Sequence, residues 1–376
     1  MKQRTRLLLL IPHLGGGGAE QVTAQLARHL DPQLFEIHLC LIAPDCPGAG
    51  SIPRWVQIHR FHRQRVRYAW FQLIRLIRAE QPDVVLSGMA HLNFLLLLLK
   101  PLLPHRIRIL VRQNTTASAA AKTWLSRLPY RFLYPRADAI LCQSEAMAAD
   151  LADNFGLPAQ KLQVLANPID MQAIRAACAP HHCKGQADAW PRLLSIGRLA
   201  HEKGMDLLLQ ALPEVIRQHP QVHLQILGTG PQEAKLRQLC VELNLETAVT
   251  FAGYRQDLAR FYAEATLFIL PSRYEGLPNA LLEAAAAGLP LAATPCSAGL
   301  YDLLHDAPGT WLAEDLSAKS LATAILAALA ALAGPPGGQH DEPQRFHHAF
   351  LAPFEIGSAI AAYAALIQSA AAQGRL

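Results

Sequence analysis

The sequence predicts an α/β protein with two doubly wound domains, each built on a parallel sheet covered by helices. Its 376 residues exceed the usual size of one domain. Hydrophobic residues make up 51% of the chain, which is enough for large cores and excludes a disordered or collagen-like protein. Short apolar runs alternate with longer helical patterns, and this alternation is typical of parallel sheets.

The first part of the chain contains six short apolar runs that we interpret as strands. Residues 6–12 form the longest nearly continuous run. The other predicted strands cover residues 36–42, 83–87, 107–112, 139–143 and 162–165, and the predicted helices cover residues 19–30 and 70–80. Pro168 then excludes a regular helix or a central strand. We therefore expect the first domain to end near residue 167.

A second series of strands and helices follows a polar connector at residues 178–190. Its predicted strands cover residues 192–196, 222–227, 266–270 and 289–294, and its predicted helices cover residues 204–218, 233–243 and 317–332. A stretch rich in Gly and Pro at residues 334–343 predicts a loop. Residues 354–373 follow with an amphipathic helical pattern.

The net charge of +5 is unevenly distributed. Residues 1–180 carry 21 Lys and Arg against 11 Asp and Glu, whereas the remaining residues carry 13 against 18. A basic first half indicates an anionic partner: a membrane surface, a phosphorylated substrate or nucleic acid. The sequence has no recognisable nucleic-acid-binding motif, so a nucleic-acid-binding module is a remote alternative and nucleic acid is not an expected partner.

No segment has the pattern of a signal peptide or a membrane-spanning helix. The apolar run at residues 7–11 stops at a proline and enters four glycines. Residues 92–103 contain five consecutive leucines, but polar residues and a proline interrupt the run, and a spanning helix needs about 20 apolar residues. We interpret this segment as a buried helix, with a position in a membrane interface as the alternative. The seven cysteines are odd in number and widely spread, so no disulfide framework is expected and the cytoplasm is the expected compartment.

A glycine loop at residues 12–20 lies where the first strand gives way to the first helix. Its four glycines allow close backbone approach, and the helix N-terminus offers free N–H groups to a phosphate. A dinucleotide-binding fingerprint is disfavoured, because Glu20 takes the position of its third glycine and a carboxylate there repels a pyrophosphate. A tight turn without a ligand is the alternative.

The most specific segment directly follows the predicted strand 266–270. Residues 272–283 are Ser-Arg-Tyr-Glu-Gly-Leu-Pro-Asn-Ala-Leu-Leu-Glu, which places Glu275 in the loop, Pro278 near a helix start and Glu283 in the first turns. Two carboxylates that flank free helix N–H groups suit the hydroxyls of a sugar and of a ribose, while the N–H groups and the helix dipole face a diphosphate. For a single Glu, the alternative is an acidic residue that favours the positive end of a helix.

At this segment the sequence resembles the family 4 retaining glycosyltransferases. Glu275 and Glu283 match the family's paired glutamates, with seven residues between them, and Ala-Ala-Gly-Leu-Pro at residues 286–290 matches as well. Three further segments agree in order and spacing, namely residues 195–204, 227–231 and 167–170. The resemblance covers essentially the whole chain and is strongest from residue 160 to residue 300.

This resemblance implies the GT-B fold, in which two Rossmann-like αβα domains face a central cleft. It implies an N-terminal, acceptor-side domain at residues 1–167 and 354–376 and a C-terminal, nucleotide-sugar-binding domain at residues 168–353. The division is discontinuous, because the C-terminal helix would cross back to pack on the first domain.

The resemblance also implies roles for individual residues. Arg198 and Lys203 would neutralise the leaving nucleoside diphosphate, a task that suits one planar guanidinium and one mobile ammonium group. Glu275 would contact the donor sugar, Glu283 the ribose, and Tyr254 would lie near the nucleobase. The other donor-binding residues would be Gly16, Gly17, Gly230, Gly276, Leu277 and Pro278.

Two positions after predicted strands of the first domain are further candidates. His91 follows the strand 83–87, where family members often have a polar group that touches the donor sugar, and its alternative role is that of a structural histidine. Arg112 and Asn114 end and follow the next predicted strand, and we expect them to contact the donor or an acceptor phosphate.

We expect no metal ion and no cofactor, because the nucleoside diphosphate sugar is itself the donor substrate. The sequence lacks an Asp-x-Asp motif of the kind that holds a metal diphosphate in the other large transferase fold, which indicates a metal-independent enzyme. Cys-Ala-Pro-His-His-Cys at residues 178–183 could in principle bind zinc, but it does not have a common ligand spacing.

Retention of configuration in this family is thought to proceed without a protein nucleophile, with the acceptor attacking from the face that the diphosphate leaves. Catalysis would then rest on stabilising the developing charge of the diphosphate by Arg198, Lys203 and helix termini. In a double displacement a carboxylate must lie against the anomeric carbon, and Glu275 is the candidate that the motif offers.

We therefore expect transfer of a hexose or N-acetylhexosamine from a nucleoside diphosphate sugar, with UDP favoured over GDP, to an envelope glycan or lipid-linked saccharide, as in lipopolysaccharide biosynthesis. Basic and aromatic residues at positions 54–78 suit anionic headgroups of a membrane, and the alternative is a solvated helix with buried aromatic side chains. The enzyme would be cytoplasmic or peripheral at the inner face of the cytoplasmic membrane. A sugar-nucleotide epimerase or hydrolase on the same fold is the alternative function; it would also need Arg198 and Glu283 but would turn over the donor without an acceptor.

Overall fold

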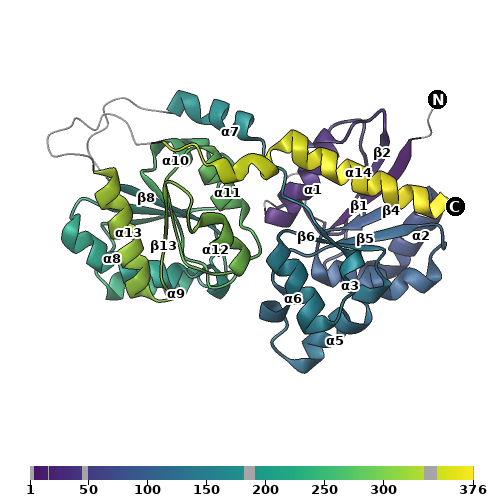
Figure 1. Cartoon of the computed structure of the whole chain (residues 1–376), viewed down its shortest axis with the longest axis horizontal. Coiled ribbons are helices and arrows are strands. Elements are labelled where there is room, and N and C mark those ends of the chain that lie inside the picture. Colours follow the sequence, from purple (N-terminus) through teal and green to yellow (C-terminus); the bar gives the residue numbers. More distant parts are fainter. Residues whose placement is uncertain (1–3, 16, 45–49, 182–190, 334–344, 376) are drawn as a thin grey trace. The chain divides into compact units, whose positions relative to one another are not determined.

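The computed structural model describes residues 4–15, 17–44, 50–181, 191–333 and 345–375. The chain forms two compact units. Unit 1 contains Met1–Pro168 and Ile356–Leu376, and unit 2 contains Ile169–Glu355. Each unit is a parallel sheet covered by helices (Figure 1), which confirms the predicted α/β class with two Rossmann-like domains.

Unit 1 has a seven-stranded parallel sheet with the order β3-β2-β1-β4-β5-β6-β7. Its strands are β1 (Thr5–Ile11), β2 (Phe35–Leu41), β3 (Gln57–Arg60), β4 (Val84–Ser87), β5 (Arg108–Arg112), β6 (Ala139–Cys142) and β7 (Leu162–Val164). Residues 7–11 of β1 are at most 1% exposed, because both faces of this strand are covered. The sequence did not predict β3, since this edge strand is polar and lacks an apolar run.

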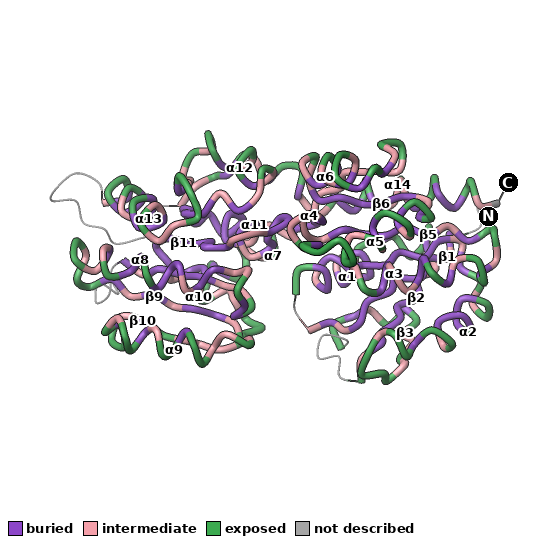
Figure 2. The backbone as a smooth tube through the Cα atoms, turned by 90° about the horizontal axis from the view of Figure 1, so that it is seen from below, coloured by how far each residue is buried: buried purple, intermediate pink, exposed green. Residues whose placement is uncertain are grey.

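Helices cover both faces of the unit 1 sheet. They are α1 (Gly18–His29), α2 (Trp70–Glu80), α3 (Ala90–Leu99), α4 (Ala117–Ala120), α5 (Trp124–Phe132), α6 (Glu145–Phe155) and α14 (Ile356–Arg375), with the short 3-10 helices η2 (Val66–Ala69), η3 (Lys100–Leu102), η4 (Tyr134–Arg136) and η5 (Ala159–Lys161). Buried side chains of α2, α3 and α6 form one core with the sheet, and those of α1 and α14 form another. Figure 2, in which the backbone is coloured by residue burial, shows many of the buried residues in the central strands.

The C-terminal helix α14 belongs to unit 1, although the whole of unit 2 precedes it in the sequence. Its buried residues Ile360, Tyr363 and Ile367 pack into the same core as β1. The Tyr363 hydroxyl accepts a hydrogen bond of 3.2 Å from Nε of Arg112 on β5. The predicted return of the last helix to the first domain is therefore confirmed.

The leucine-rich segment forms a mostly buried helix, as predicted. It contains α3 and the short η3, and their side chains Leu98 and Leu102 are 58% and 52% exposed. Among the described residues, no helix has the length and apolar character needed to span a membrane.

Unit 2 has a six-stranded parallel sheet with the order β10-β9-β8-β11-β12-β13. Its strands are β8 (Arg192–Ile196), β9 (His223–Leu227), β10 (Val249–Gly253), β11 (Leu267–Leu270), β12 (Leu291–Ala293) and β13 (Thr310–Leu312). Its helices are α7 (Met171–Cys178), α8 (Met205–Gln218), α9 (Glu233–Glu242), α10 (Ala259–Glu264), α11 (Asn279–Ala286), α12 (Ala298–Leu304) and α13 (Ala318–Leu332), with η6 (Ala179–His181), η8 (His201–Lys203) and η9 (Ala349–Phe354).

The edge strand β10 of unit 2 was not predicted from the sequence. This strand is only partly buried, so its sequence lacks the apolar run on which strand prediction relies.

The strand order reverses its direction at one place in each sheet. In unit 1 this place lies between the adjacent strands β1 and β4, and in unit 2 it lies between β8 and β11. Open α/β sheets bind ligands at the carboxyl ends of the strands at such a reversal, because the following connections run to opposite faces. The loops after β8 and β11 contain the residues predicted to bind the donor, and the loops after β1 and β4 lead to Gly17 and His91.

Candidate active site

The loop after β8 is held against the loop after β11 by a glycine with a left-handed backbone. Gly204 has a φ of +62°, and a Cβ atom there would lie 1.9 Å from the carbonyl oxygen of Pro271. The backbone N–H of Arg273 donates to the carbonyl of Glu202 at 2.8 Å. These contacts place η8, which carries Lys203, directly beside the loop that carries Glu275.

The loop after β9 supports the loop after β8 from its other side. A Cβ atom on Gly228 would lie 2.0 Å from the carbonyl oxygen of Gly197, and one on Gly230 would lie 2.4 Å from that of Leu199. The Leu199 N–H also donates to the Thr229 carbonyl at 3.0 Å. Gly230, a predicted donor-binding residue, therefore lies at a position where close packing of two loops requires glycine.

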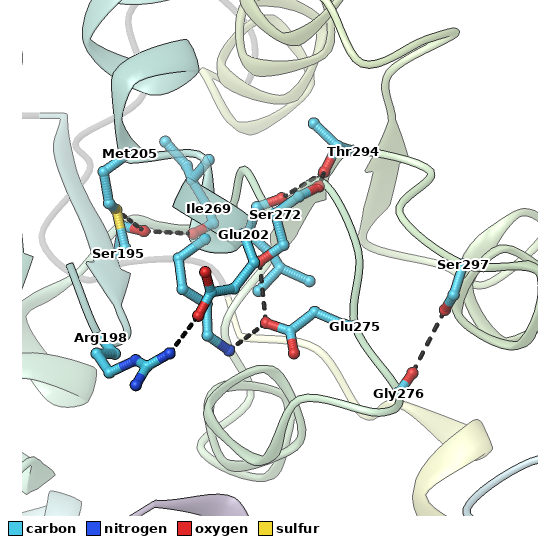
Figure 3. Close-up of polar contacts among 12 residues, drawn as sticks. Ser195, Arg198, Glu202, Met205, Ile269, Ser272, Glu275, Gly276, Thr294 and Ser297 are labelled. Carbon is cyan, nitrogen blue, oxygen red and sulfur yellow. Dashed lines mark hydrogen bonds and ion pairs between the residues drawn. The ribbon is translucent and has the colours of Figure 1, made fainter. Parts of the chain in front are cut away.

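Lys203 and Glu275 form an ion pair between the two loops. The Lys203 ammonium group donates to Oε1 of Glu275, and Ser272 Oγ donates to the same oxygen at 3.0 Å (Figure 3). The side chains of Lys203 and Glu275 are 24% and 10% exposed. The structure thus brings together a cation predicted to bind the diphosphate and a carboxylate predicted to contact the sugar.

Arg198 is far more accessible than Lys203. Its side chain is 66% exposed, and its Nη2 lies 2.5 Å from Oε1 of Glu202. Burial alone would raise the pKa of Glu202, but the hydrogen bond and charge of Arg198 lower this pKa below its usual value. Because an exposed ion pair of this kind is weak, Arg198 can exchange Glu202 for a stronger anion.

Glu283 lies on α11, the helix that follows the Glu275 loop. The Tyr262 hydroxyl donates to Oε2 of Glu283 at 2.9 Å. Burial and the neighbouring carboxylate of Glu283 raise the pKa of Tyr262 well above its usual value, so this hydroxyl stays protonated and acts as a donor.

The start of α11 has no side-chain cap from its N-cap residue. Pro278 is its N-cap residue and provides no side-chain hydrogen bond to the first turn. Gly276, Leu277 and Pro278 are themselves buried, and the Gly276 carbonyl accepts a hydrogen bond of 3.3 Å from Ser297 (Figure 3). The predicted loop residues thus have a fixed backbone at the positive end of a helix.

Several supporting residues were missed by the sequence analysis. Ser195 on β8 donates from its hydroxyl to the Ile269 carbonyl on β11 at 2.9 Å, and Thr294 Oγ1 lies 2.5 Å from the Ser272 carbonyl (Figure 3). Arg273 makes two hydrogen bonds to the carboxylate of Asp206, of 2.7 and 2.6 Å. Their sequence signal was weak, since serine, threonine and arginine are common in loops and only the tertiary contacts give these positions a role.

In unit 1, a cavity of about 380 Å³ opens at the carboxyl ends of β1, β2 and β4. The polar and basic residues that line it include His13, Arg63, Gln64, Arg65 and His91. Burial and the charge of His13 lower the pKa of His91, so His91 is neutral at neutral pH. The structure thus gives His91 a place in a basic cavity of unit 1.

The first glycine loop lies next to this cavity. Gly17 is the exposed N-cap residue of α1, and Gly16 lies outside the described residues. Glu20 is only 6% exposed, and its carboxylate lies 3.5 Å from Nδ1 of His13 and so close to Gly17 that a Cβ atom there would meet it at 2.4 Å. A buried carboxylate beside the loop is a further physical argument against a dinucleotide pyrophosphate.

Arg112 and Asn114 make hydrogen bonds within unit 1. Arg112 is 3% exposed, and its guanidinium donates to Tyr363, to Asn167 at 2.5 Å and to Asn114. Asn114 in turn donates to the carbonyl of Gly88. This network joins β5 to α14 and to the end of unit 1. The contact of Arg112 and Asn114 with the donor or an acceptor phosphate stays a prediction.

Tyr254 and the first cysteine of the possible zinc motif lie in different parts of unit 2. Tyr254 directly follows β10 and is 49% exposed, so its ring is accessible to a planar ligand. Cys178 is buried at the end of α7, whereas residues 182 and 183 of the weighed zinc motif lie outside the described residues.

Comparison with known proteins identifies the family. Residues 16–173 match the family described as Glycosyltransferase Family 4, and residues 190–331 match Glycosyl transferases group 1. The chain belongs to the family 4, group 1 glycosyltransferases. This finding confirms the family to which the paired glutamates and glycine loops pointed, and it establishes the protein as a glycosyltransferase.

Relatives of this glycosyltransferase are named for a diphospho-undecaprenol acceptor and for amylovoran biosynthesis. A Campylobacter jejuni protein, named N-acetylgalactosamine-N,N'-diacetylbacillosaminyl-diphospho-undecaprenol 4-alpha-N-acetylgalactosaminyltransferase, is 28% identical over 323 residues, or 80% of this chain and 84% of the relative. The amylovoran biosynthesis glycosyltransferase AmsK of Erwinia amylovora is 33% identical over 143 residues, which make up 36% of this chain and 35% of that protein.

Solved glycosyltransferase structures share the fold of the whole chain. The Anabaena protein HepE, solved with UDP and glucose, has a TM-score of 0.79 at 18% identity, with coverage of 98% of this chain and 100% of that chain. The lipopolysaccharide outer core galactosyltransferase WaaB has a TM-score of 0.65 at 16% identity, with coverage of 99% and 100%. At these identities the likeness concerns the GT-B fold alone.

Proposed function

We propose that this glycosyltransferase transfers a hexose or N-acetylhexosamine, with retention of configuration, from a UDP-sugar to a lipid-linked saccharide of an envelope glycan. One observation carries the proposal. Arg198 and the Lys203–Glu275 pair lie on loops that follow the neighbouring strands β8 and β11, at the reversal of strand order in unit 2. UDP is supported as the nucleotide by fold relatives that were solved with UDP.

In this proposal the diphosphate replaces carboxylates as the partner of both cations. Arg198 turns from Glu202 to the phosphates, because its side chain is exposed and the diphosphate is the more highly charged anion. Lys203 shares its three donors between Glu275 and the phosphates. The start of α11 adds backbone N–H groups, Glu283 binds the ribose, and Glu275 contacts the sugar with the oxygen that neither Lys203 nor Ser272 engages.

The same contacts favour a mechanism without a covalent intermediate. Glu275 accepts hydrogen bonds from Lys203 and Ser272 on one oxygen, and these stabilise the carboxylate and weaken it as a nucleophile. We therefore propose that the bond from the anomeric carbon to the diphosphate breaks while the acceptor oxygen attacks from the same face, and that the acceptor proton passes to a phosphate oxygen. Arg198 and Lys203 stabilise the charge that develops on the diphosphate, and the step needs no metal ion and no cofactor.

The acceptor is assigned to the basic cavity of unit 1. Arg63 and Arg65 line this cavity, and guanidinium groups are suited to bind phosphate groups such as those of a diphospho-lipid. The C. jejuni relative is named for a diphospho-undecaprenol acceptor, which supports this class of substrate. His91, which lines the same cavity, would be the residue that meets the transferred sugar.

A lipid-linked acceptor implies contact with a membrane, and we assign this contact to unit 1. The aromatic side chains Tyr68, Trp70 and Phe71 are about half exposed, which disfavours the alternative of buried aromatics at positions 54–78. The helix α5 adds an exposed apolar surface that the sequence analysis missed, formed by Trp124, Leu125, Leu128 and Phe132. Arginines on the same helix suit anionic headgroups around this apolar surface.

The donor site is tested with Arg198→Ala and Lys203→Ala. Each variant should lower the rate of transfer by about 10²- to 10³-fold, because each removes a charge that stabilises the leaving diphosphate. Arg217→Ala, which removes an exposed arginine paired with Glu214 on α8, is the matched control and should keep full activity. Normal turnover in either site variant would contradict the proposed mechanism.

Thermal shifts with free nucleotides test the donor independently of turnover. UDP should raise the melting temperature of the wild type more than GDP or ADP does, and both site variants should lose this shift. Release of UDP from a UDP-sugar at the full rate without any acceptor would instead support a hydrolase, and conversion of the UDP-sugar to its epimer without net release of UDP would support an epimerase. The configuration of the product, determined by NMR, tests retention.

A further inference from the structure

Three residues of unit 1 that the catalytic proposal does not use lie close together and could each provide a metal ligand. His38 lies on β2, His59 on the edge strand β3, and Glu80 is the last residue of α2. Nδ1 of His38 lies 3.0 Å from Nε2 of His59 and 3.6 Å from Oε2 of Glu80. All three ligand atoms lie within 4.8 Å of one another, and among the described residues no other such group of His, Cys, Asp or Glu is found.

The separations match the coordination shell of a small transition-metal ion. Bonds of about 2.0–2.1 Å from zinc to nitrogen and oxygen place neighbouring ligand atoms of a tetrahedron about 3.3–3.4 Å apart. The two distances from His38 Nδ1, 3.0 and 3.6 Å, lie on either side of this value. The third distance, between the ligand atoms of His59 and Glu80, is at most 4.8 Å. Glu80 is half-buried, and its carboxylate can approach by side-chain rotation, whereas His38 is 1% exposed and fixed in the sheet.

Outer residues orient the buried histidine as they do around known metal ligands. Oε1 of Glu36 lies 3.4 Å from Nε2 of His38, the ring nitrogen that points away from His59 and Glu80. Arg6 lies 3.3 Å from the other oxygen of Glu36 and also donates to the backbone carbonyl of Glu80 at 2.6 Å. A carboxylate behind a histidine holds the proton on the outer nitrogen and leaves the inner nitrogen free to bind a metal.

A simple pair of hydrogen-bonded histidines explains less of this arrangement. It accounts for the 3.0 Å contact between His38 and His59, but it gives no reason for Glu80 to face the same nitrogen of His38. A metal on Nδ1 fixes the tautomer in which Nε2 carries a proton, and this proton then faces Oε1 of Glu36, which lies 3.4 Å from Nε2.

We propose that His38, His59 and Glu80 bind one divalent transition-metal ion, with zinc as the expected ion and water in the fourth position. Two imidazoles and a carboxylate form a donor set that zinc accepts in tetrahedral geometry. Partial exposure of His59 and Glu80 gives the ion a path from solvent. The site is distinct from Arg198, Lys203, Glu275 and Glu283 of the proposed donor site, which all lie in unit 2.

The ion would hold both ends of the segment that carries the basic cavity residues. β3 lies at the edge of the sheet beside β2 (Figure 2), where one neighbouring strand stabilises it. The helix α2 ends at Glu80. Between these two elements run Arg63, Gln64, Arg65 and Val66, which line the unit 1 cavity. Binding of the ion to β2, β3 and α2 would therefore restrict the motion of this segment without any part in the chemical step.

The test uses the full chain without a histidine tag, first freed of metal with a chelator. Added Zn²⁺ should bind in a 1:1 ratio, measured by mass spectrometry of the dialysed protein. At an excess of about 100-fold over its dissociation constant it should raise the melting temperature of unit 1 by roughly 5 to 10 °C. Co²⁺ bound in its place should give the strong visible absorption of a tetrahedral complex.

His59→Gln and Glu80→Gln should each abolish the zinc-induced shift and the cobalt spectrum, while their metal-free forms should melt near the metal-free wild type. His223→Gln is the matched control, because His223 is also a partly buried strand histidine and contacts Thr250 at 3.0 Å. A wild-type chain that retains no zinc and shows no shift would overturn the proposal. So would either site variant if it bound zinc as tightly as the wild type does.

Discussion

The two units share a doubly wound topology but differ in charge and surface. Unit 1 carries 21 Lys and Arg against 10 Asp and Glu, for a net charge of +11, whereas unit 2 carries 13 against 19, for a net charge of −6. Among the described residues, unit 1 exposes large hydrophobic side chains on η2, α2, α3, η3 and α5 as well as at Leu34 and Trp55. Unit 2 exposes Val241, Tyr254, Tyr301 and Leu316.

The units also differ in how their strand ends are built. In unit 2, the loops after β8, β9 and β11 are packed against one another through glycines, and the cations at their surface are paired with carboxylates. In unit 1, the equivalent strand ends surround an open basic cavity. One topology therefore supports a tightly specified loop cluster in one unit and an accessible charged surface in the other, because the loops and not the sheet determine the chemistry.

Substitutions in the packed loops of unit 2 should have the largest effect on the stability of a unit. Gly204→Ala and Gly228→Ala should each destabilise unit 2 by more than about 3 kcal/mol, because the new Cβ would overlap a backbone carbonyl at a positive φ. Gly253→Ala is the control, since Gly253 has a φ of +70° but no atom within 4 Å of the added Cβ. It should cost only about 1 kcal/mol. Hydrogen exchange of the unit 2 strands measures the effect, and equal losses in all three variants would contradict it.

The exposed apolar surface of unit 1 should dominate membrane binding. The double variant Trp124→Ala/Phe132→Ala on α5 should weaken binding to anionic vesicles by roughly 10- to 100-fold, because each ring would bury apolar surface in the interface. Tyr301→Ala, which removes an exposed aromatic side chain of unit 2, should leave binding unchanged. Vesicle sedimentation at low and high salt measures both. No binding of the wild type at either salt concentration would refute the membrane role.

The basic cavity should affect the acceptor without affecting the donor. Arg63→Ala and Arg65→Ala should each raise the KM for a diphospho-lipid acceptor by about 10-fold, because each removes a charge-assisted contact with phosphate. UDP binding to unit 2 should not change. Arg60→Ala, in the same basic stretch but outside the cavity lining, is the control. A loss of UDP affinity in the cavity variants would contradict the assignment of the acceptor to unit 1 and of UDP to unit 2.

The smallest expected effect is a difference in acid sensitivity. Burial tends to raise the pKa of Asp138, but hydrogen bonds from Ile109 and Lys100, together with Arg108, hold this pKa below the usual value of an aspartate. Because the folded pKa is the lower one, the stabilisation is complete above about pH 4 and disappears as the pH falls through the folded pKa. Asp138→Asn should therefore cost unit 1 about 1 to 2 kcal/mol at pH 7, and this cost should shrink as the pH falls through the folded pKa.

Asp206, paired with Arg273, is the counterpart in unit 2, and burial and this arginine act on its pKa in the same opposing directions. Its side chain is 35% exposed against 18% for Asp138, so Asp206→Asn should have the smaller effect. Hydrogen exchange between pH 3 and pH 7 compares the two variants. A larger loss for Asp206→Asn would mean that exposure does not control these ion pairs.

Much of the fold was predictable because its signals are local. The apolar runs at β1, β8 and β11 and the helical pattern of α2 depend on the buried faces of each element, and these repeat over a few residues. The strands β3, β10 and β13 were missed, because short and half-exposed edge strands do not require an apolar run. The glycines near the donor site were found because a close approach of backbone leaves no room for a side chain.

The sequence by itself determined the α/β class, the two units, the family and the positions of Arg198, Lys203, Glu275 and Glu283, since each of these is encoded in a short contiguous pattern. The tertiary structure alone decided which groups meet. Arg112 and Tyr363 are 251 residues apart, Lys203 and Glu275 are 72 residues apart, and both pairs are joined by the return of distant strands and helices. Such contacts depend on the folded path of the chain, and no local pattern records them.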